Sequence, residues 1–405
     1  MPNHPTHPGV RLVDGAFYAD DPHRHWSWMR ENAPVYWDEE GQVWGITLYE
    51  DVLAVSKNPK IFCNSRGMRP DAPPMPYMVG LDDPEHKKRR SLVNKGFTPN
   101  RIAHREPRIR EICVDLIERA TQKETFDFVM DLAAWLPLIV IGDMLGVDED
   151  AYPDLLRWSE DMVLGTGAMT LERLQKAEKA FLEYLDYQRR VIDDRRSKPP
   201  QEDLVSILVH AEIDGQKLTD DDVLLETLLI LIGGDETTRH VITSGMYQLL
   251  RHPADLDHLR REPGAIPTAL EEMLRWASPI QNMARTATED SQLRGQTICA
   301  GQKLLLLYPS ANRDAAVFRN PFEFDMRRQP NDHVAFGYGA HFCLGASLAR
   351  LELRVFFEEL LARAPEIELC DSDPPRMRPS NFISGIEELP VRVGRPAEGQ
   401  KKLSL

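Results

Sequence analysis

The chain has 405 residues, enough on length alone for roughly two to three domains and for a large buried core. Its formal net charge of −15 argues against nucleic acid or an anionic membrane as the main partner. The five cysteines show no paired spacing, the N-terminus has no signal-peptide pattern and no apolar run approaches the ~20 residues of a membrane span, so we expect a cytoplasmic protein without a disulfide framework.

The first eighty residues are predicted to form small elements. We expect a short helix over Pro22 to Glu31, an antiparallel hairpin from Val35 to Thr47 and a helix from Tyr49 to Lys57. The segment from Arg66 to Gly80 contains four prolines and cannot be regular. Its simplest interpretation is a surface loop, yet its methionines also offer adaptable apolar contacts.

A third helix is predicted to begin near Pro84, because two acids and a proline favour a helix start. It opens on the run His86-Lys87-Lys88-Arg89-Arg90. His86 and Arg90 stand four apart and therefore share one face of the helix, while the residues between them face elsewhere. A charge run of this kind is usually a solvated face.

The middle of the chain is predicted to be helical. Helices are expected from Pro107 to Gly146 and from Asp150 to Arg196, with breaks at Gly146 and at residues 197–200. Gly165-Thr166-Gly167 indicates a loop between two helices. The composition does not shift along the chain and no internal repeat is present, so no domain boundary is predicted here.

The next helix, from Leu218 to about His252, is almost wholly apolar inside and is expected to run through the centre of the protein. Thr219 and the three aspartates after it form a good N-terminal cap. Inside this helix stands Gly233-Gly234-Asp235-Glu236-Thr237-Thr238, where each glycine costs roughly 1 kcal/mol against alanine. One interpretation is a close helix crossing with satisfied polar groups, and the other is a reactive site.

Two further groups of residues precede the C-terminal region. Glu272 and Arg275 stand three apart on a predicted helix, where an exposed ion pair would contribute little to stability. The segment Ser278 to Ala287, which contains Arg285, follows it. Residues 290–309 alternate as short strands around two glycines.

A glycine-rich turn, Phe336 to Gly345, leads into an amphipathic helix that reaches about Ala364. Cys343 stands where the turn meets the helix, so unpaired N–H groups and the positive end of the helix dipole favour a thiolate over a thiol. A lone cysteine is usually a small buried hydrophobe. That role, however, requires neither flanking glycines nor a helix N-terminus beneath the sulfur.

The pattern F-x-x-G-x-H-x-C-x-G in this turn resembles the haem-binding loop of the cytochrome P450 superfamily. The resemblance implies that Cys343 is the axial iron ligand of haem b. It also implies that His341 hydrogen-bonds a haem propionate and that Phe336 packs against the ring near the sulfur. Gly337 and Gly345 belong to the same haem-binding loop.

The resemblance extends to the cations found earlier in the chain. His86 and Arg90 match an H-x-x-x-R motif that grips the haem propionates, and Arg285 matches a third propionate contact. The basic residues 87–89 would then face away from the haem. On an acidic protein such a patch would suit docking of an acidic ferredoxin.

Glu272 and Arg275 match the superfamily's E-x-x-R motif. In the superfamily this pair is buried and helps to fix the loop that presents the cysteine. An arginine or histidine from the segment before that loop usually completes the group. The equivalent stretch here offers Glu323, and Arg327 or Arg328 are the other candidates for the third partner.

The glycine-rich segment of the central helix matches the oxygen-activation motif G-G-x-[DE]-T. By the resemblance, Gly233 and Gly234 let the helix distort and make room for O2. Thr237 would hold the bound oxygen and an ordered water, and Glu236 would relay solvent protons. Asp235 has no assigned role.

The resemblance also implies an apolar substrate pocket. Its candidate wall residues are Met75, Met78, Val79, Val163, Ile280, Met283, Phe382 and Ile383. Within the superfamily, residues 131–134, 141–146, 226–239 and 378–385 look like the actinobacterial enzymes that hydroxylate the terminal carbon (C26 or C27) of the cholesterol or cholest-4-en-3-one side chain. We therefore expect a steroid or another long apolar substrate.

Together these features predict a mainly α, single cytochrome P450 domain over residues 1–405, a triangular helical prism with small antiparallel sheets and flexible ends at 1–15 and 396–405. The expected enzyme is a monooxygenase that inserts one atom of O2 into a C–H bond, with electrons from NAD(P)H through ferredoxin reductase and ferredoxin. The alternatives are a fatty-acid or terpenoid hydroxylase, a peroxide-driven enzyme and a non-catalytic haem protein. Glu236 and Thr237 argue against the last two.

Overall fold

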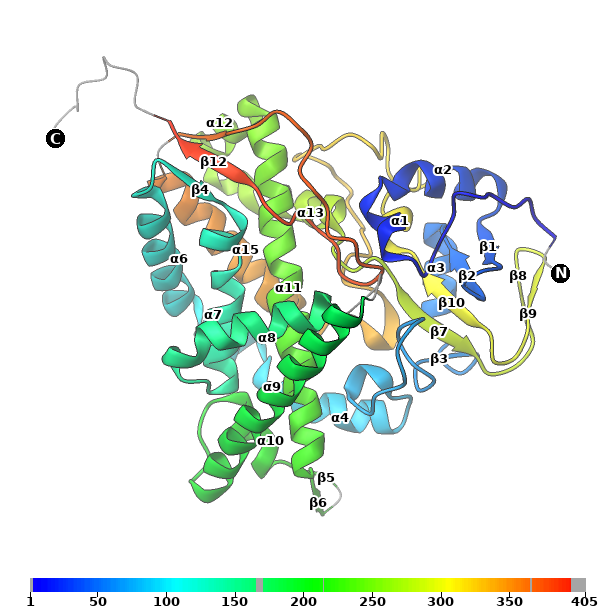
Figure 1. Ribbon diagram of the computed structural model, residues 1–405, viewed down its shortest axis with the longest axis horizontal. Helices are drawn as coiled ribbons and strands as arrows, with labels where there is room; N and C mark the ends of the chain where they lie inside the picture. Colours follow the sequence, from blue (N-terminus) through cyan, green and yellow to red (C-terminus); the bar gives the residue numbers. More distant parts are fainter. Residues whose placement is uncertain (1–2, 165–169, 214, 365, 395–405) are drawn as a thin grey trace.

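The structure, a computed structural model, describes residues 3–164, 170–213, 215–364 and 366–394. The predicted loop at Gly165-Thr166-Gly167 and the expected flexible tail 396–405 lie outside these residues. The described chain is mainly helical with small sheets, as predicted. Figure 1 shows most of the helices on one side of the molecule and the largest sheet on the other.

The helices and strands have the following bounds. The helices are α1 (Gly15–Ala19), α2 (Pro22–Asn32), α3 (Tyr49–Ser56), α4 (Glu85–Val93), α5 (Pro99–Ala103), α6 (Glu106–Thr121), α7 (Trp135–Leu145), α8 (Tyr152–Leu164), α9 (Leu171–Ser197), α10 (Leu204–His210), α11 (Asp220–Arg251), α12 (Pro253–Arg261), α13 (Ile266–Ala277), α14 (Tyr308–Ala311) and α15 (Ala346–Arg363). The strands are β1 (Val35–Asp38), β2 (Val43–Ile46), β3 (Phe62–Cys63), β4 (Thr125–Asp127), β5 (Glu212–Ile213), β6 (Gln216–Lys217), β7 (Met283–Ala287), β8 (Ser291–Leu293), β9 (Gln296–Ile298), β10 (Lys303–Leu306), β11 (Ile367–Leu369) and β12 (Pro390–Val393).

The largest sheet has five strands in the order β1-β2-β10-β7-β3. The predicted hairpin from Val35 to Thr47 supplies β1 and β2, which pair antiparallel. Strand β10 pairs parallel with β2 and antiparallel with β7, so the expectation of purely antiparallel sheets fails at this one pair. Residues 283–287 on β7 are thereby fixed between β10 and the edge strand β3, and Arg285 with them.

Helix α11 is the central element, as its apolar sequence predicts. Thr219 and Asp222 form a reciprocal capping box at its start, in which each side chain accepts a hydrogen bond from the other residue's backbone N–H. The helix packs against α7, α8, α9, α13 and α15. Figure 1 shows it crossing nearly the whole height of the molecule, with these helices gathered around it.

Two parts of the chain differ from the sequence-based expectation. The stretch 107–146, predicted as helices, contains β4 and a π-helical turn at Val129–Ala133 between α6 and α7. Strand β4 forms because it pairs with β12, more than 260 residues further on, which local periodicity does not report. Residues 3–15, expected to be flexible, pack onto the sheet through Val10 and Leu12, both of which are buried.

The segment from Arg66 to Gly80 is irregular, as predicted, except for a short 3-10 turn at Met78–Gly80. All five cysteines are free. Over the ranges that the structure describes, no helix combines the length and the apolar character required to cross a bilayer.

Candidate active site

A cavity of about 510 Å³ lies between α11, α15, the Arg66–Gly80 segment and the turn before α15. All eight predicted substrate-contact residues lie on its wall, namely Met75, Met78, Val79, Val163, Ile280, Met283, Phe382 and Ile383. Four of the apolar residues, Met68, Val163, Phe382 and Ile383, form one small buried cluster. Cys343 also lines this cavity, so the sulfur and the apolar wall share one space.

The turn that presents Cys343 is closed by its own backbone. The Cys343 N–H donates to the carbonyl of Phe336 over 2.9 Å, and Gly337 and Gly339 have φ values of +68° and +78°, which favour glycine. A Cβ at Gly339 would lie 2.6 Å from the Ser56 carbonyl oxygen. The turn therefore lies flat against α3 and directs the cysteine into the cavity.

The Cys343 sulfur is subject to two opposing influences. Its accessible surface belongs to a cavity wall, and the protein around it raises the pKa of the thiol by desolvation. The N–H groups of Gly345 and Ala346 at the start of α15, together with Arg90, lower that pKa. The expected helix-terminus effect is present, but burial outweighs it. A metal bound to the sulfur would therefore be needed to keep it as thiolate.

Four nitrogen-bearing side chains form a cluster beside the same cavity: Arg90, Arg285 and His341 line it, and His86 lies against His341. The His86 and His341 rings lie 4.0 Å apart between centroids. Arg90 donates to the carbonyl of Phe342 over 2.6 Å, and Arg285 is buried beside the Tyr308 hydroxyl.

One carboxylate reaches this cluster, because Asp83 Oδ1 lies 3.3 Å from His86 Nδ1, but two buried ring nitrogens stay without a partner among the described residues. Neither Nε2 of His86 nor Nδ1 of His341 has a hydrogen-bond partner among the described residues, although both are buried. Burial, with Arg285 and His86 nearby, lowers the pKa of His341 to about 2. Among the described residues on the cavity wall, Glu352 is the one acidic side chain. A ligand that brings carboxylates to the cluster and a metal to the sulfur would satisfy both, and a haem has both features.

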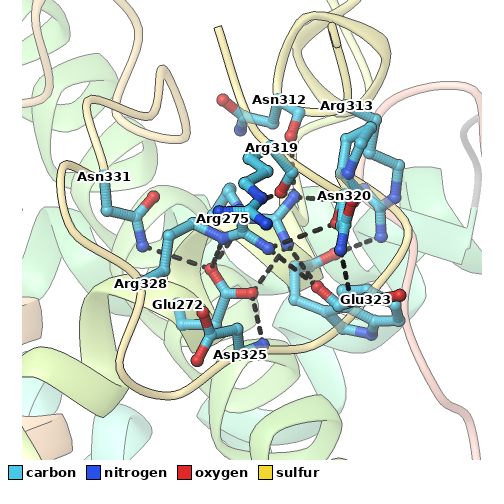
Figure 2. Close-up of polar contacts among 12 residues, drawn as sticks. Glu272, Arg275, Asn312, Arg313, Arg319, Asn320, Glu323, Asp325, Arg328 and Asn331 are labelled. Atoms are coloured by element: carbon cyan, nitrogen blue, oxygen red, sulfur yellow. Dashed lines mark hydrogen bonds and ion pairs between the residues drawn. The ribbon is translucent and has the colours of Figure 1, made fainter.

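The Glu272–Arg275 pair is fully buried, as expected. Arg275 holds both carboxylate oxygens of Glu272 at 2.7 Å and donates to the backbone carbonyls of Asn312 and Pro321. Arg328 is the third partner, with its Nε 3.0 Å from Glu272 Oε2. Figure 2 shows the two guanidinium groups meeting the carboxylate from different elements.

The other two candidates for the third partner do not reach Glu272. The Glu323 side chain accepts from Asn320, as Figure 2 shows, and Glu323 contacts Arg275 and Arg328 only through its backbone carbonyl. Arg327 pairs instead with Asp255 on the surface. The Glu272 group thus ties α13 to the segment 312–331. Asn312, in turn, accepts from the Val334 N–H just before the Cys343 turn.

On α11, the two glycines of the GGDETT segment have different surroundings. A Cβ at Gly234 would lie 2.5 Å from Ile141 on α7, so this glycine permits a close helix crossing. A Cβ at Gly233 would meet nothing within 4 Å, because Gly233 faces the cavity. Thr237 lines the cavity too, and its hydroxyl donates to the Gly233 carbonyl over 2.8 Å. Gly234 thus fits the interpretation as a close helix crossing, and the reactive site stays a prediction, for which Gly233 and Thr237 are placed on the wall that Cys343 shares.

Glu236 does not line the cavity. Its Oε2 lies 2.6 Å from Arg378 Nη1 and 2.5 Å from Arg239 Nη2, and the side chain is fully buried. Burial by itself would raise the pKa of Glu236, but Arg239 and Arg378 outweigh it and hold the pKa well below its usual range. Arg239 also pairs with Glu160, which connects this group to α8.

Several functional candidates were not found from the sequence. Arg378, which holds Glu236, is far from it in the chain, and no local signal connects them. Glu352 lies on α15 among apolar residues, and burial, with Asp235 nearby, raises its pKa well above the usual range. A carboxylate on an apolar helix face is a signal that could have found Glu352. The aromatic wall residues Tyr77, Phe97 and Phe181 carried no signal of their own.

The basic residues after Pro84 do not all face solvent in the structure. Lys87 and Lys88 are exposed on α4, as expected. Arg89 is not part of an exposed patch, because it pairs with Asp222 over 2.6 Å and with the buried Glu226 over 3.2 Å. It faces α11 because two acids on that helix are available to it.

Comparison with known proteins finds a matching family model, relatives in sequence and a relative in structure. The Cytochrome P450 family model matches residues 143–392. The chain is 47% identical over 388 residues to a steroid C26-monooxygenase of Mycolicibacterium smegmatis, covering 95% of this chain and 96% of that protein. It is 38% identical over 361 residues to a methyl-branched lipid omega-hydroxylase of Mycobacterium tuberculosis, covering 86% and 83%. The crystal structure of CYP109E1 from Bacillus megaterium in complex with corticosterone superposes with a TM-score of 0.83 at 36% identity, covering 92% and 98%.

Proposed function

The chain belongs to the cytochrome P450 family and is a haem-thiolate monooxygenase, and on this premise we propose that it hydroxylates the terminal carbon of a steroid side chain. The observation that carries the proposal is that Cys343, Thr237 and a long apolar wall face one cavity. We further propose that residues 1–405 form a single domain, which the 95% coverage of a relative nearly equal in length supports.

We assign the cofactor contacts as follows. Cys343 would bind the iron of haem b, and Phe336 would pack beside it under the guanidinium of Arg350, which stands 4.6 Å from the Phe336 ring centroid. The donor cluster of His86, Arg90, Arg285 and His341 would hold the two propionates. The unpartnered ring nitrogens of His86 and His341 support that assignment, because buried polar atoms require hydrogen-bond partners.

When bound, haem supplies the chemistry by which one atom of O2 enters a C–H bond and the other leaves as water, at the cost of two electrons and two protons. Thr237 keeps a hydroxyl proton at the cavity wall, where the hydroxyl donates a hydrogen bond to the Gly233 carbonyl. Turning that hydroxyl away from the carbonyl presents its proton to the cavity. Gly233, without a side chain, leaves the space beside it free.

We propose that Glu236 relays protons to Thr237, which follows it in the chain. In the position observed its carboxylate is ionised and held by Arg378 and Arg239. It therefore takes up a proton from water only after its side chain turns away from these arginines. The relay requires a rotation of Glu236, and Arg378 is the group that opposes it.

The proposed substrate follows from the cavity and from what the relatives are named for. The cavity wall is mostly apolar, which suits a sterol skeleton with its aliphatic side chain. One relative is a steroid C26-monooxygenase, and another is a methyl-branched lipid omega-hydroxylase. Carbon 26 of a sterol is one of two methyl ends of a branched tail, so both names describe oxidation at the end of such a tail. A methyl-branched lipid is therefore the second candidate substrate.

We propose that electrons come from NAD(P)H through ferredoxin reductase and ferredoxin in the cytoplasm. The exposed Lys87 and Lys88 support a dock for an acidic partner, because they lie on α4, whose Arg90 contacts the turn that bears Cys343. The free state of all five cysteines supports a reducing compartment.

A spectral titration tests the substrate directly. Cholest-4-en-3-one, a methyl-branched fatty acid and a straight-chain fatty acid are added to the haem-loaded protein, and the shift to high spin is followed. Product analysis after turnover with ferredoxin and its reductase then locates the hydroxyl group. We expect cholest-4-en-3-one to give the shift and a C26 alcohol. A shift with only the straight-chain acid, or equal turnover with peroxide alone, would overturn the proposal.

A further inference from the structure

A buried carboxyl on α11 is hydrogen-bonded to the wall of the cavity, and the proposed reaction assigns no role to this carboxyl. Glu226 is fully buried, about two helical turns before Gly233. Its Oε1 accepts the backbone N–H of Met78 over 2.7 Å and a hydrogen bond from Arg89 over 3.2 Å. Its Oε2 is buried and has no partner within the described ranges. Glu226 itself does not line the cavity.

The segment that Glu226 holds, Met75–Gly80, is a tight part of the cavity wall. Met75, Tyr77, Met78, Val79 and Gly80 all line the cavity. The segment folds back on itself so closely that a Cβ at Gly80 would lie 2.2 Å from the Met75 carbonyl oxygen. Its side chains therefore reach the cavity only while this backbone fold is kept.

Two buried polar side chains from outside the segment fix this fold. Glu226 accepts from the Met78 N–H, and the amide of Asn64 donates to the carbonyl of Val79 over 2.9 Å. Asn64 and Glu226 are each at most 1% exposed. Met78 is thus hydrogen-bonded to α11, and the next residue, Val79, is hydrogen-bonded to the chain after β3.

Burying a carboxyl at this place in an apolar helix costs free energy, and burial raises the pKa of Glu226 to about 7. Arg89 offsets part of that cost, and Asp222, one turn earlier on α11, holds Arg89 in place over 2.6 Å. Removing the carboxyl would leave the Met78 N–H buried without an acceptor. The contact therefore specifies one position of the segment.

We propose that Glu226 is a positioning residue that fixes the Met75–Gly80 segment against α11 and thereby sets how tightly the cavity holds its apolar substrate. The part about substrate rests on the proposed function. The part about the segment does not, because it concerns the protein without substrate.

The test uses the haem-loaded full chain in three variants. Glu226→Ala removes the acceptor, and Glu226→Gln keeps a carbonyl oxygen for the Met78 N–H. Asp222→Asn is the matched control, since it weakens the second ion pair of Arg89 but leaves the Met78 contact intact. Hydrogen exchange of residues 75–80 is measured without substrate. Affinities for cholest-4-en-3-one and a methyl-branched fatty acid are measured by spectral titration.

We expect Glu226→Ala to speed exchange of residues 75–80 and to weaken binding of the apolar probe, each by roughly 10-fold or more, the factor that corresponds to one lost buried bond. Glu226→Gln should recover most of both, and Asp222→Asn should stay close to the wild type. The reduced carbon monoxide spectrum should be the same in all variants, because Cys343 is not involved.

Unchanged exchange of residues 75–80 in Glu226→Ala would overturn the proposal, as would faster exchange with an unchanged affinity. Should Glu226→Ala not fold, Glu226→Gln decides the matter. A glutamine variant that behaves like the wild type supports the positioning role, and one that loses affinity while exchange stays slow contradicts it. Wild-type protein that binds neither probe refutes the proposed function, and the exchange data then decide the role of Glu226 alone.

Discussion

Thr237 and Glu236 are neighbours in sequence, yet they have opposite surroundings. A step of one residue turns the side chain by about 100° around a helix. Thr237 accordingly lines the cavity, while Glu236 points into a buried group with Arg239 and Arg378. The two residues therefore act at different points of proton transfer, and the motif that joins them in the sequence does not say which one touches the reacting space.

Replacing the cavity hydroxyl should uncouple electron use from product formation. In Thr237→Ala, NADPH consumption continues, but product formed per NADPH falls roughly 10-fold or more and hydrogen peroxide appears, because no side-chain proton stands at the cavity wall. The measurement is the ratio of product to NADPH with peroxide assayed in parallel. Thr227→Ala is the matched control, since Thr227 also donates to its own helix, at the Leu224 carbonyl, and does not line the cavity. Equal coupling in both variants would refute the role of Thr237.

The Glu226 carboxyl gives a pH dependence of known sign. Its pKa is raised from 4.5 to about 7 in the folded protein, with burial as the main cause and Arg89 opposing it. A raised pKa means that the folded state binds the proton more tightly than the unfolded chain does. The contribution to stability is therefore full below the unfolded pKa and is lost as the pH rises through about 7.

We expect Glu226→Gln to flatten the fall of the midpoint temperature between about pH 5 and about pH 8, relative to the wild type. Thermal unfolding at a series of pH values measures this. Arg89 on α4 and Asp222 on α11 face the same carboxyl and stay in place in this variant. Parallel pH profiles for the two proteins would contradict the assigned pKa shift.

At the scale of elements, the two glycines of α11 should respond differently to substitution: Gly234 affects helix packing, and Gly233 affects the space in the cavity. Gly234→Ala places a methyl group 2.5 Å from Ile141 and should lower the free energy of unfolding by about 1–3 kcal/mol. Gly233→Ala meets no atom within 4 Å and should raise it slightly, since alanine is the better helix former. Its methyl group, however, enters the cavity, so affinity for the substrate should fall. Denaturant unfolding of both variants checks the first two statements, and equal stabilities would contradict them.

The Glu272 group determines whether the Cys343 turn is held in place. Glu272→Ala leaves Arg275 buried without a counter-charge, which costs roughly 3–5 kcal/mol in comparable cases, and the purified protein should contain far less haem. Glu323→Ala serves as the control, because only the backbone of Glu323 joins the group. Stability and haem content are measured for both. Full haem content in Glu272→Ala would show that the turn does not depend on this group.

Helices and short strands were not equally predictable from sequence. The bounds of α11 could be predicted closely, because its cap and its apolar interior are both local features. Strand β4 could not, since its three residues are a strand only through pairing with β12. The third partner of Glu272 also could not be chosen. Arg327 and Arg328 are adjacent, and only the path of the chain directs one inward and the other to the surface.

At the scale of the whole molecule, the site consists of segments that meet only in the fold. Arg90 on α4 contacts the carbonyl of Phe342, 252 residues away. Arg285 comes from β7 and Thr237 from α11. Each motif could be found by itself in the sequence, and Arg90, Thr237, Arg285 and Cys343, which come from four of them, do share one cavity wall. The contacts between distant segments, such as Glu226 with Met78 or Glu236 with Arg378, could not be predicted, because neither partner carries a local signal for the other.

Every role proposed for the cavity requires a bond between the Cys343 sulfur and the haem iron, and one spectrum tests that bond. The purified haem-loaded protein is reduced under carbon monoxide and its Soret band is recorded beside that of Cys343→Ala. We predict the strongly red-shifted band of thiolate-ligated haem in the wild type and its absence in the variant. A wild-type band at the position given by a histidine-ligated haem, from correctly folded protein, would contradict the assignment of Cys343.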